Sequence, residues 1–233
     1  MAEKKFLPFI VLQILEELSD ESHILSTNEL IDHIERRSGI SIERRTLYSN
    51  IEILEQAGYI ISKFADNGKG YYLEKRQFSK GEVLLLCNAI HASHFISSKQ
   101  SNTLIASLLK TLNKYDQKDY HDAVYMPNMQ KTSNDLLFDN IAKLSEAIQK
   151  KKVIQFVYMH YDSNKKLVPK RETLYTVEPR FIVYQDSRPY LITTSKTHPG
   201  FTHYRIDKIC KLSITTEKVN PFMKESEQDA YHY

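Results

Sequence analysis

The chain of 233 residues lacks most of the features by which enzymes are recognised. It has only 6 glycines, and neither a Gly-x-x-x-x-Gly-Lys loop nor a Gly-x-Ser-x-Gly turn, the motifs that hold phosphates or present a nucleophilic serine. Spacings typical of zinc ligands, such as Cys-x-x-Cys and His-Glu-x-x-His, are also missing. We therefore expect no metal site, no cofactor and no enzymatic activity.

Long hydrophobic runs are missing as well. No segment approaches the roughly 18 apolar residues of a membrane span, and acidic residues closely follow the short apolar stretch at the N-terminus. We expect a cytoplasmic protein without a signal peptide or membrane contact. The 2 cysteines, Cys87 and Cys210, lie far apart within apolar patterns, which predicts buried free thiols rather than a disulfide.

Charge is unevenly distributed, although the net charge is only +3. Residues 1–75 hold 9 basic and 13 acidic residues, whereas residues 151–215 hold 12 basic and 5 acidic ones. A basic segment attracts anions such as nucleic acids and phosphorylated ligands. The charges of a small domain can also serve only for solvation, so both interpretations stay open at this point.

The N-terminal segment has the pattern of three helices. Apolar residues at positions 7, 10, 11, 14, 15 and 18 form one helical face. Ser26 and Glu29 have the spacing of a capping box, and Ser38-Gly39 ends this second helix. A third helix, which Ser41 can cap, has a buried stripe of three residues: Leu47, Ile51 and Leu54.

Strand-forming residues flank the stretch 66–70, "DNGKG", which is typical of a β-hairpin. Three short helices and a hairpin make a winged helix-turn-helix, whose third helix reads the major groove of DNA. Polar side chains near the start of that helix and on the hairpin can contact bases and phosphates. The predicted DNA-binding residues are Arg44, Arg45, Thr46, Tyr48, Ser49, Lys63 and Lys69. A winged helix that binds protein is the alternative, because residues 1–75 carry a net charge of −4.

The third helix also resembles that of DeoR-like and WYL-containing transcription regulators, which often reads Thr-x-Tyr-Arg-Asp-Ile, then Leu and a Gly-Tyr end. The sequence "TLYSNIEILEQAGY" matches this pattern at five positions: Thr46, Tyr48, Ile51, Leu54 and Gly58. Ser49 and Asn50 replace the Arg-Asp pair, which removes one side chain able to bind phosphate or guanine. The resemblance implies a DNA-binding transcription regulator.

Residues 77–132 have the pattern of a helical connector. We expect a helix from about Ser79 to Ile96 that is apolar on two faces and is therefore covered on both, within the protein or at an oligomer interface. A second amphipathic helix follows in "SNTLIASLLKTLNKY", whereas the polar stretch "DQKDYHDAVYMPNMQKTS", broken by Pro127, is predicted to be a loop. Such helices would join two copies in a homodimer, which suits a reader of palindromic DNA.

A further helix in "SNDLLFDNIAKLSEAIQKKK" precedes a change to period two and to β-forming residues. Five strands are expected, in "VIQFVYMHY", "KRETLYTVEPRFIVYQ", "YLITTSK", "FTHYRI" and "CKLSITT". This spacing predicts a small curled barrel, and four prolines mark its loops or strand starts: Pro169, Pro179, Pro189 and Pro199.

Residues 133–215 resemble the WYL domain of bacterial regulators, through a Val-Glu-Pro, a hairpin into "PYL" and the element "HYRIDKICKLSI". The resemblance implies an SH3-like or Sm-like β-barrel that senses a ligand, often nucleic acid or nucleotide-like, and controls the attached DNA reader. The chain has no tryptophan, so Pro189 stands at the namesake Trp. Family members often carry a further C-terminal domain, so the chain is either a short form or part of a longer protein.

The ligand surface that the resemblance implies carries over to Tyr190 and Arg205. To these we add polar or cationic groups near strand ends, and rings on which a base could stack. The predicted ligand-binding residues are Tyr158, Tyr161, Arg171, Arg180, Tyr190, His203 and Arg205. Structural roles are the alternative, because Tyr158 and Tyr190 can be core aromatics and Arg205 can pair with Asp207 or Glu178.

We therefore predict an α+β protein with a winged helix-turn-helix DNA-binding domain (1–76), a helical connector and dimerisation region (77–132), a WYL-like small SH3/Sm-like β-barrel for ligand sensing (133–216) and a tail (217–233). The predicted partners are a double-stranded DNA operator and, at the barrel, a single-stranded nucleic acid or nucleotide effector. The alternative function is a module that binds RNA or single-stranded DNA and uses the winged helix for protein contacts.

Overall fold

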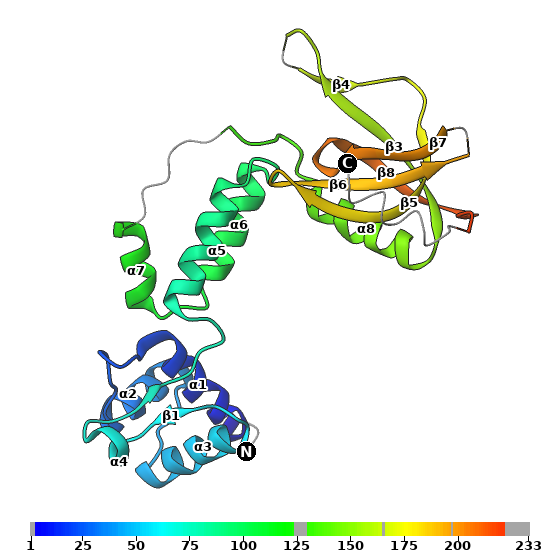
Figure 1. Cartoon of the computed structure of the whole chain (residues 1–233). Coiled ribbons are helices and arrows are strands. Elements are labelled where there is room, and N and C mark those ends of the chain that lie inside the picture. Colours follow the sequence, from blue (N-terminus) through cyan, green and yellow to red (C-terminus); the bar gives the residue numbers. More distant parts are fainter. Residues whose placement is uncertain (1–2, 124–129, 165, 197, 222–233) are drawn as a thin grey trace. The chain divides into compact units, whose positions relative to one another are not determined.

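The structure is a computed structural model, and it describes residues 3–123, 130–164, 166–196 and 198–221. Helices make up the N-terminal part and an antiparallel sheet the C-terminal part, so the predicted α+β class is confirmed (Figure 1). The helices are η1 (Glu3–Phe6), α1 (Leu7–Leu18), α2 (Thr27–Ser38), α3 (Arg44–Gln56), α4 (Phe64–Asn67), α5 (Lys80–Ala92), α6 (Ser98–Leu109), α7 (Lys114–Ala123), α8 (Leu137–Gln149) and η2 (Ile206–Lys208). The strands are β1 (Ile61–Ser62), β2 (Tyr72–Leu73), β3 (Lys152–Tyr161), β4 (Leu167–Pro169), β5 (Tyr175–Gln185), β6 (Arg188–Ser195), β7 (His198–Arg205) and β8 (Ile209–Lys218).

Two compact units share the chain, and neither is a single block of sequence. The first unit consists of Met1–Ala89 and Thr103–Pro127, and the second of Ile90–Asn102 and Asn128–Tyr233. Two of the three boundaries fall inside helices, one in α5 and one in α6, and the third lies outside the described residues. The functional assignment of residues 1–76, 77–132 and 133–216 stays a prediction, and residues 222–233 of the predicted tail lie outside the described residues.

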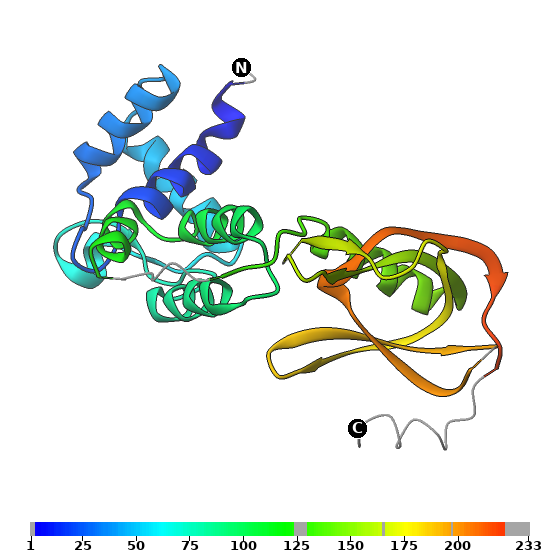
Figure 2. The ribbon, with the colours of Figure 1, turned by 90° about the horizontal axis from the view of Figure 1, so that it is seen from above.

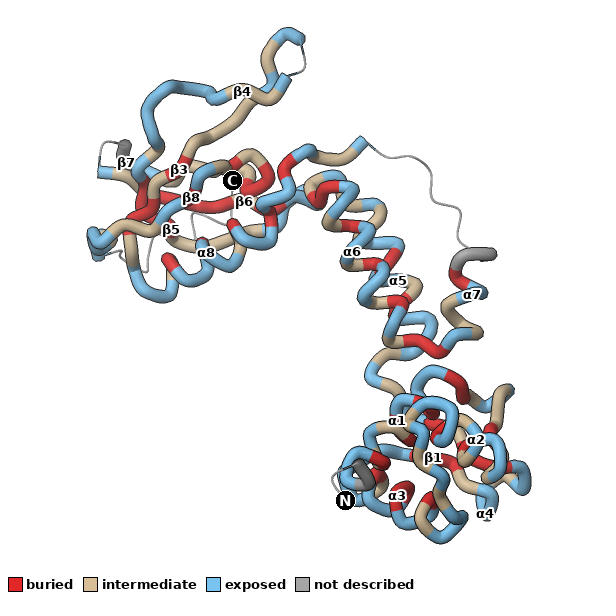
Figure 3. Tube along the Cα trace, turned by 180° about the vertical axis from the view of Figure 1, so that it is seen from behind, coloured by how far each residue is buried: buried red, intermediate tan, exposed pale blue. Residues whose placement is uncertain are grey.

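The core of the first unit is built by α1, α2 and α3 as their apolar periodicity predicts. The buried residues of these helices include Leu7, Val11, Ile14, Leu15, Leu30, Ile34, Leu47, Ile51 and Leu54 (Figure 3). The predicted capping box of α2 is confirmed, since the Ser26 backbone amide donates to a Glu29 carboxylate oxygen (2.8 Å) while the Glu29 amide donates to the Ser26 hydroxyl (3.3 Å). Gly39 ends α2 at a φ of 69°, in the left-handed region that favours glycine.

The start of α3 and the turn between β1 and β2 differ from the sequence prediction. Glu43 holds the N-cap position of α3 without a side-chain bond, so Ser41 does not cap this helix. The strands β1 and β2 pair antiparallel, but residues 64–67 between them form the short helix α4 instead of part of a hairpin turn. The helix is favoured locally because the Asp66 carboxylate accepts from the Lys63 amide (2.9 Å) and Gly68 ends the turn at a φ of 69°.

Helix α7 occupies a stretch that the sequence predicts as a loop. Asn113 caps it, because its side-chain carbonyl accepts from the amides of Tyr115 and Asp116, both at 2.9 Å. The ammonium of Lys80 lies 2.8 Å from carboxylate oxygens of both Asp116 and Asp119. The loop prediction was wrong here because α7 is held by these polar contacts and by the buried Tyr120 (3% exposed), without the apolar stripe that periodicity reveals. The remainder of that stretch, residues 124–129 with Pro127, lies outside the described residues.

The second unit contains a six-stranded antiparallel sheet in the order β4-β3-β5-β6-β7, in which β8 also pairs with β3. Helix α8 packs on β3, β5 and β8 (Figure 2). Its buried residues join those of the strands in one core cluster that includes Leu137, Leu144, Ala147, Phe156, Leu191 and Ile209. The predicted helix and the five predicted strands are confirmed, and β4 is an additional strand.

The sheet is not closed. No pairing joins β7 to β8 in the part of the chain that the structure describes, because η2 follows β7 and the chain then returns to pair with β3. The predicted barrel is therefore an open sheet over these residues. Pro179 lies inside β5 rather than at its start, beside a bulge where the missing amide donor costs little. None of the helices among the described residues is long and apolar enough to cross a membrane.

Candidate functional site

The start of α3 exposes the polar residues that the sequence analysis selects for DNA binding. Leu47, Asn50, Ile51 and Leu54 face the core, while Arg44, Arg45, Tyr48 and Ser49 are exposed and Thr46 is half-buried. Because the helix begins at Arg44, these side chains lie at its positive end, where phosphate groups bind favourably. The Arg44 guanidinium donates to the side-chain oxygen of Asn28 (3.1 Å), which ties it to α2.

The two predicted lysines lie around α4 and have different surroundings. The Lys63 ammonium lies 2.8 Å from the Glu55 carboxylate, and this hydrogen bond raises the pKa of Lys63. Its charge is therefore partly neutralised by α3. Lys69 is exposed, and only its backbone is fixed, by donation to the Asn67 side chain (2.7 Å). The structure thus brings five predicted residues together on α3, and among the described residues the Lys69 ammonium has no ion-pair partner.

A cavity of about 520 Å³ opens in the second unit. Its lining comes from the turn between α5 and α6, the segment before α8, the ends of β3 and β7, the start of β6, and η2. The lining residues are His94, Gln130, Lys131, Thr132, Tyr161, Arg188, Arg205 and Asp207. Of the predicted ligand-binding residues, Tyr161 and Arg205 line this cavity.

Arg205 is fixed by a buried partner at the cavity wall. Its Nε donates to Oδ1 of Asp207 (3.0 Å) and its Nη2 to Oδ2 (2.6 Å), and these bonds raise the pKa of Arg205. Asp207 is only 3% exposed, so one carboxylate orients the guanidinium almost completely. Nη1 has no hydrogen-bond partner among the described residues. Arg205 therefore pairs with Asp207, as a structural role requires. It also lines the cavity, where its Nη1 group can donate to a ligand.

Two predicted tyrosines surround Arg205. The Tyr158 hydroxyl accepts from the Arg205 backbone amide (3.2 Å), and burial raises the pKa of Tyr158. Tyr190 lies opposite Arg205 in the pairing of β6 with β7 and is half-buried. Leu191, its neighbour on β6, is fully buried in the core, so Tyr190 points to the opposite face of the sheet.

Further cations crowd the same region. Lys208 Nζ lies 5.7 Å from the centre of the Tyr161 ring. Burial lowers the pKa of Lys208, and the nearby charges of Arg205, Arg188 and Lys170 lower it further. Arg188 is exposed beside the cavity. A site in which neighbouring cations lower the pKa of Lys208 has an electrostatic preference for an anionic ligand.

The other predicted ligand residues lie outside the cavity lining. Arg171 stacks on the Tyr175 ring, 3.5 Å from its centre. Arg180 forms an ion pair with Glu178 (2.6 Å) whose side chains are 9% and 5% exposed. His203 lies opposite Ile192 in the β6 and β7 pairing, two residues from Arg205 and on the same face of β7. Their roles in ligand binding stay predictions.

Some residues of the site were missed from the sequence. Arg188 in the cavity lining and Lys208 near the Tyr161 ring stand directly beside the selected motifs, in "SRPYL" and "RIDK", so a search for cations at the hairpin ends could have found them. His94 and the segment 130–132 gave no signal, because tertiary packing alone brings them to the sheet.

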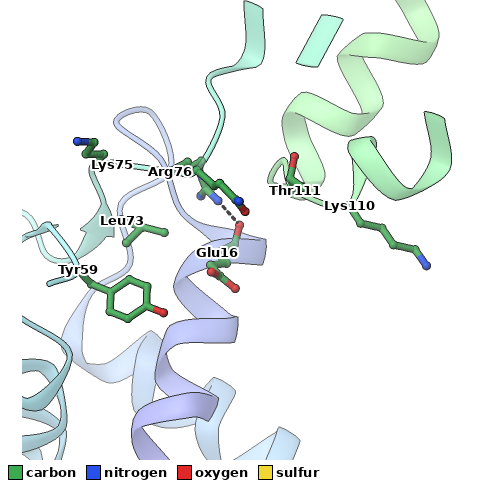
Figure 4. Close-up of a pocket in the computed structure, with 8 residues that line it drawn as sticks. Glu16, Tyr59, Leu73, Lys75, Arg76, Lys110 and Thr111 are labelled. Atoms are coloured by element: carbon green, nitrogen blue, oxygen red, sulfur yellow. Dashed lines mark hydrogen bonds between the residues drawn. The ribbon is translucent and has the colours of Figure 1, made fainter. Parts of the chain in front are cut away.

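A second cavity, of about 490 Å³, lies in the first unit (Figure 4). The positively charged side chains that line it do not point toward a common position. Arg76 donates there to the carbonyl oxygens of Glu16 (2.7 Å), Ser19 (2.5 Å) and Leu15 (3.3 Å), so its guanidinium caps the C-terminal end of α1. Figure 4 shows Lys75 and Lys110 extending away from each other. Because these cations do not converge, the cavity in the second unit is the better candidate ligand site. Within the described ranges, no group of three or more His, Cys, Asp or Glu side chains could hold a metal ion.

Comparison with known proteins identifies the C-terminal segment. Residues 139–214, about a third of the chain, match the family model of the WYL domain. Among solved structures, the chain is similar to the proteasome accessory factor B/C (PafBC) of Arthrobacter aurescens, with 16% sequence identity and a TM-score of 0.31. That similarity covers 95% of this chain and 34% of the other, so the chain spans about a third of its length. No curated protein matches the chain.

Proposed function

We propose that the chain is a DNA-binding transcription regulator, with a winged helix-turn-helix at its N-terminus and an SH3-like or Sm-like WYL domain that binds an anionic, nucleic-acid or nucleotide-like effector. Effector binding modulates operator binding, and two copies read the operator as a homodimer in the cytoplasm without enzymatic activity. The order of three helices and two short antiparallel strands supports the first part. The WYL match and the cationic cavity support the second.

One observation carries the proposal: the exposed start of α3. Two exposed arginines, a tyrosine and a serine gather around the positive end of this helix, where phosphate groups bind favourably. In a major groove, this arrangement lets arginine contact guanine or phosphate and lets the hydroxyls contact phosphate oxygens. Ser49, at the position where the related pattern has arginine, supplies a shorter and uncharged contact.

The test compares Arg44→Ala and Arg45→Ala with Arg36→Ala, an exposed arginine on α2 that serves as the charge-matched control. Duplexes selected by the wild-type chain from a random pool are titrated at several salt concentrations by fluorescence anisotropy. Each α3 substitution should weaken binding about tenfold or more and reduce the salt slope by about 1 if it removes a phosphate contact. Affinities equal to that of Arg36→Ala at matched salt would remove the basis for the DNA-reading role.

A second candidate is a module that binds single-stranded nucleic acid through the WYL domain while its N-terminal helices contact protein. The pairing of Lys63 with Glu55 favours it, because this pairing weakens the positive field beside α3. Arg188→Ala separates the two functions. In the regulator, this substitution weakens effector binding and leaves binding of the selected duplex unchanged, whereas in the module it weakens all nucleic-acid binding.

A further inference from the structure

The turn between α5 and α6 is built into the core of the second unit. Ile96 in this turn is 7% exposed and belongs to the same core cluster as Leu191 of β6. Phe95 lies edge-on to the Tyr184 ring of β5, with 6.5 Å between ring centres. The turn also supplies His94 to the cavity wall. The end of a helical hairpin is therefore a structural part of the candidate ligand site.

Lys131 joins the cavity lining to both helices of this hairpin. Its ammonium donates to the carbonyl oxygens of Ile90 (3.2 Å) and Ser93 (2.9 Å) at the end of α5, and to the hydroxyl of Ser101 in α6 (3.0 Å). An ammonium has three donors, so all of them are used. The neighbouring Thr132 amide donates to the His94 carbonyl oxygen (2.9 Å), which fixes the segment against the turn.

The same segment is also attached to the opposite wall of the cavity. The side-chain amide of Asn134 donates to the carbonyl oxygens of Asp207 (2.8 Å) and Ile209 (3.1 Å). Asp207 in turn orients Arg205. Residues 131–134 thus connect the wall that presents Arg205 with the helical hairpin.

The surroundings of Lys131 leave its charge poorly balanced. Burial lowers the pKa of Lys131, and its hydrogen-bond partners are two carbonyls and a hydroxyl rather than a carboxylate. Hydrogen bonds between an ammonium and a phosphate are stronger than those to neutral oxygens. A phosphate in the cavity, attracted by Arg188 and Arg205, therefore competes with the end of α5 for this ammonium.

We propose that Lys131 transmits occupancy of the cavity to the α5–α6 hairpin: a phosphate-bearing ligand draws the ammonium away from the Ile90 and Ser93 carbonyls and loosens the last turn of α5. The inference rests on the proposed function, and it specifies how the same site is regulated. Helix α5 begins in the first unit and ends in the second, so the loosened turn lies in a segment of chain that joins the two units. The ligand shifts the hairpin only by the difference in its affinity for the two arrangements.

Hydrogen exchange of the full chain, followed over residues 86–103, tests the proposal. The variant is Lys131→Met, which keeps a long side chain but removes the charge, and the control is Lys143→Met, an exposed lysine on α8. Without ligand, Lys131→Met should speed exchange in the last turn of α5 about tenfold, and Lys143→Met should leave it unchanged. Unchanged exchange in Lys131→Met overturns the proposal.

The second arm adds a probe, a 5′-phosphorylated single-stranded DNA of about 12 nucleotides. It should speed exchange at the end of α5 in the wild-type chain and in Lys143→Met, and add nothing in Lys131→Met. If Lys131 had only a structural role, the probe would speed exchange at the end of α5 by the same amount in all three chains. That result would refute transmission through Lys131. Binding without any change at α5 refutes the inference alone. A probe that does not bind, or binds equally well to Arg188→Ala, refutes the proposed effector and the inference with it.

Discussion

Replacing Arg180 by methionine should destabilise the second unit without weakening effector binding. The guanidinium donates to the Glu178 carboxylate (2.6 Å), the Thr194 hydroxyl (2.8 Å) and the Asn220 carbonyl oxygen (3.0 Å). Glu178 and Arg180 are 5% and 9% exposed, so water cannot replace the lost partner. Breaking a buried ion pair in this way costs about 3–5 kcal/mol.

The cost should lie at the lower end of that range, at about 3 kcal/mol. The Glu178 carboxylate retains three donors, the Thr194 hydroxyl (2.8 Å) and the Asn220 amide and side chain (3.1 and 2.7 Å). The double substitution Glu178→Gln with Arg180→Met should cost about 1 kcal/mol less than Arg180→Met alone, because it leaves no unpaired buried charge.

Urea unfolding followed by circular dichroism measures these differences. With a slope of about 1.5 kcal/mol per molar urea, Arg180→Met should lower the midpoint of the transition of the second unit by about 2 M. Arg171→Met is the control, because its exposed guanidinium contacts two carbonyl oxygens and the Tyr175 ring, with no carboxylate partner among the described residues. Equal midpoints for the two variants, together with weaker effector binding in Arg180→Met, would show that Arg180 contacts the ligand and would refute the structural role.

Two further predictions concern the first unit. Hydrogen bonds from Ser26 hold the pKa of Glu29 below its usual value of 4.5. The capping box therefore stabilises α2 above the pH at which Glu29 titrates in the unfolded chain. This contribution to stability is lost as the pH falls through the lowered pKa. Ser26→Ala should return the pKa of Glu29, followed by NMR titration, towards 4.5, and an unchanged value would contradict the capping role. At Gly70, an added Cβ would lie 2.2 Å from the Leu25 carbonyl oxygen, so Gly70→Ala should cost about 1–3 kcal/mol. Gly81→Ala, with open space around the new atom, should instead stabilise α5 by up to about 1 kcal/mol. Equal thermal unfolding temperatures for these two variants would contradict the close approach.

Periodicity in the sequence predicts those elements that bury an apolar stripe. Helices α1, α2, α3 and α8 and the five longer strands belong to this group, and the capping box of α2 was predicted from two residues. Elements held by polar contacts were missed. Helix α7 depends on Asn113 and Lys80, and α4 on Asp66 and Gly68, so their stabilisation lies in single hydrogen bonds that a periodic pattern does not reveal. The open sheet was missed because strand number and spacing do not determine which strands pair at the edges.

The residues of the candidate site also fall into a group that the sequence predicts and a group that it does not. Arg205 and Tyr161 were predicted from the sequence, and the structure places both at the cavity. Arg180 was selected as a ligand contact, and its buried ion pair with Glu178 could not be foreseen from the sequence; its role in ligand binding stays a prediction that Arg180→Met tests. Lys131 was assigned to a loop, since its neighbours in space are 30 to 41 residues away in the chain. Long-range contacts of this kind are not encoded in any local motif.

The division of α5 and α6 between two units has a practical consequence for work with fragments. The stretch that matches the WYL domain begins at residue 139, but the compact unit around it includes residues 90–102. A fragment cut at the family boundary loses Ile96 from its hydrophobic core, and with Lys131 and Asn134 it loses the polar contacts that shape the cavity. Such a fragment would expose apolar surface and present an incomplete site, so a failure to bind ligand would say little about the intact chain.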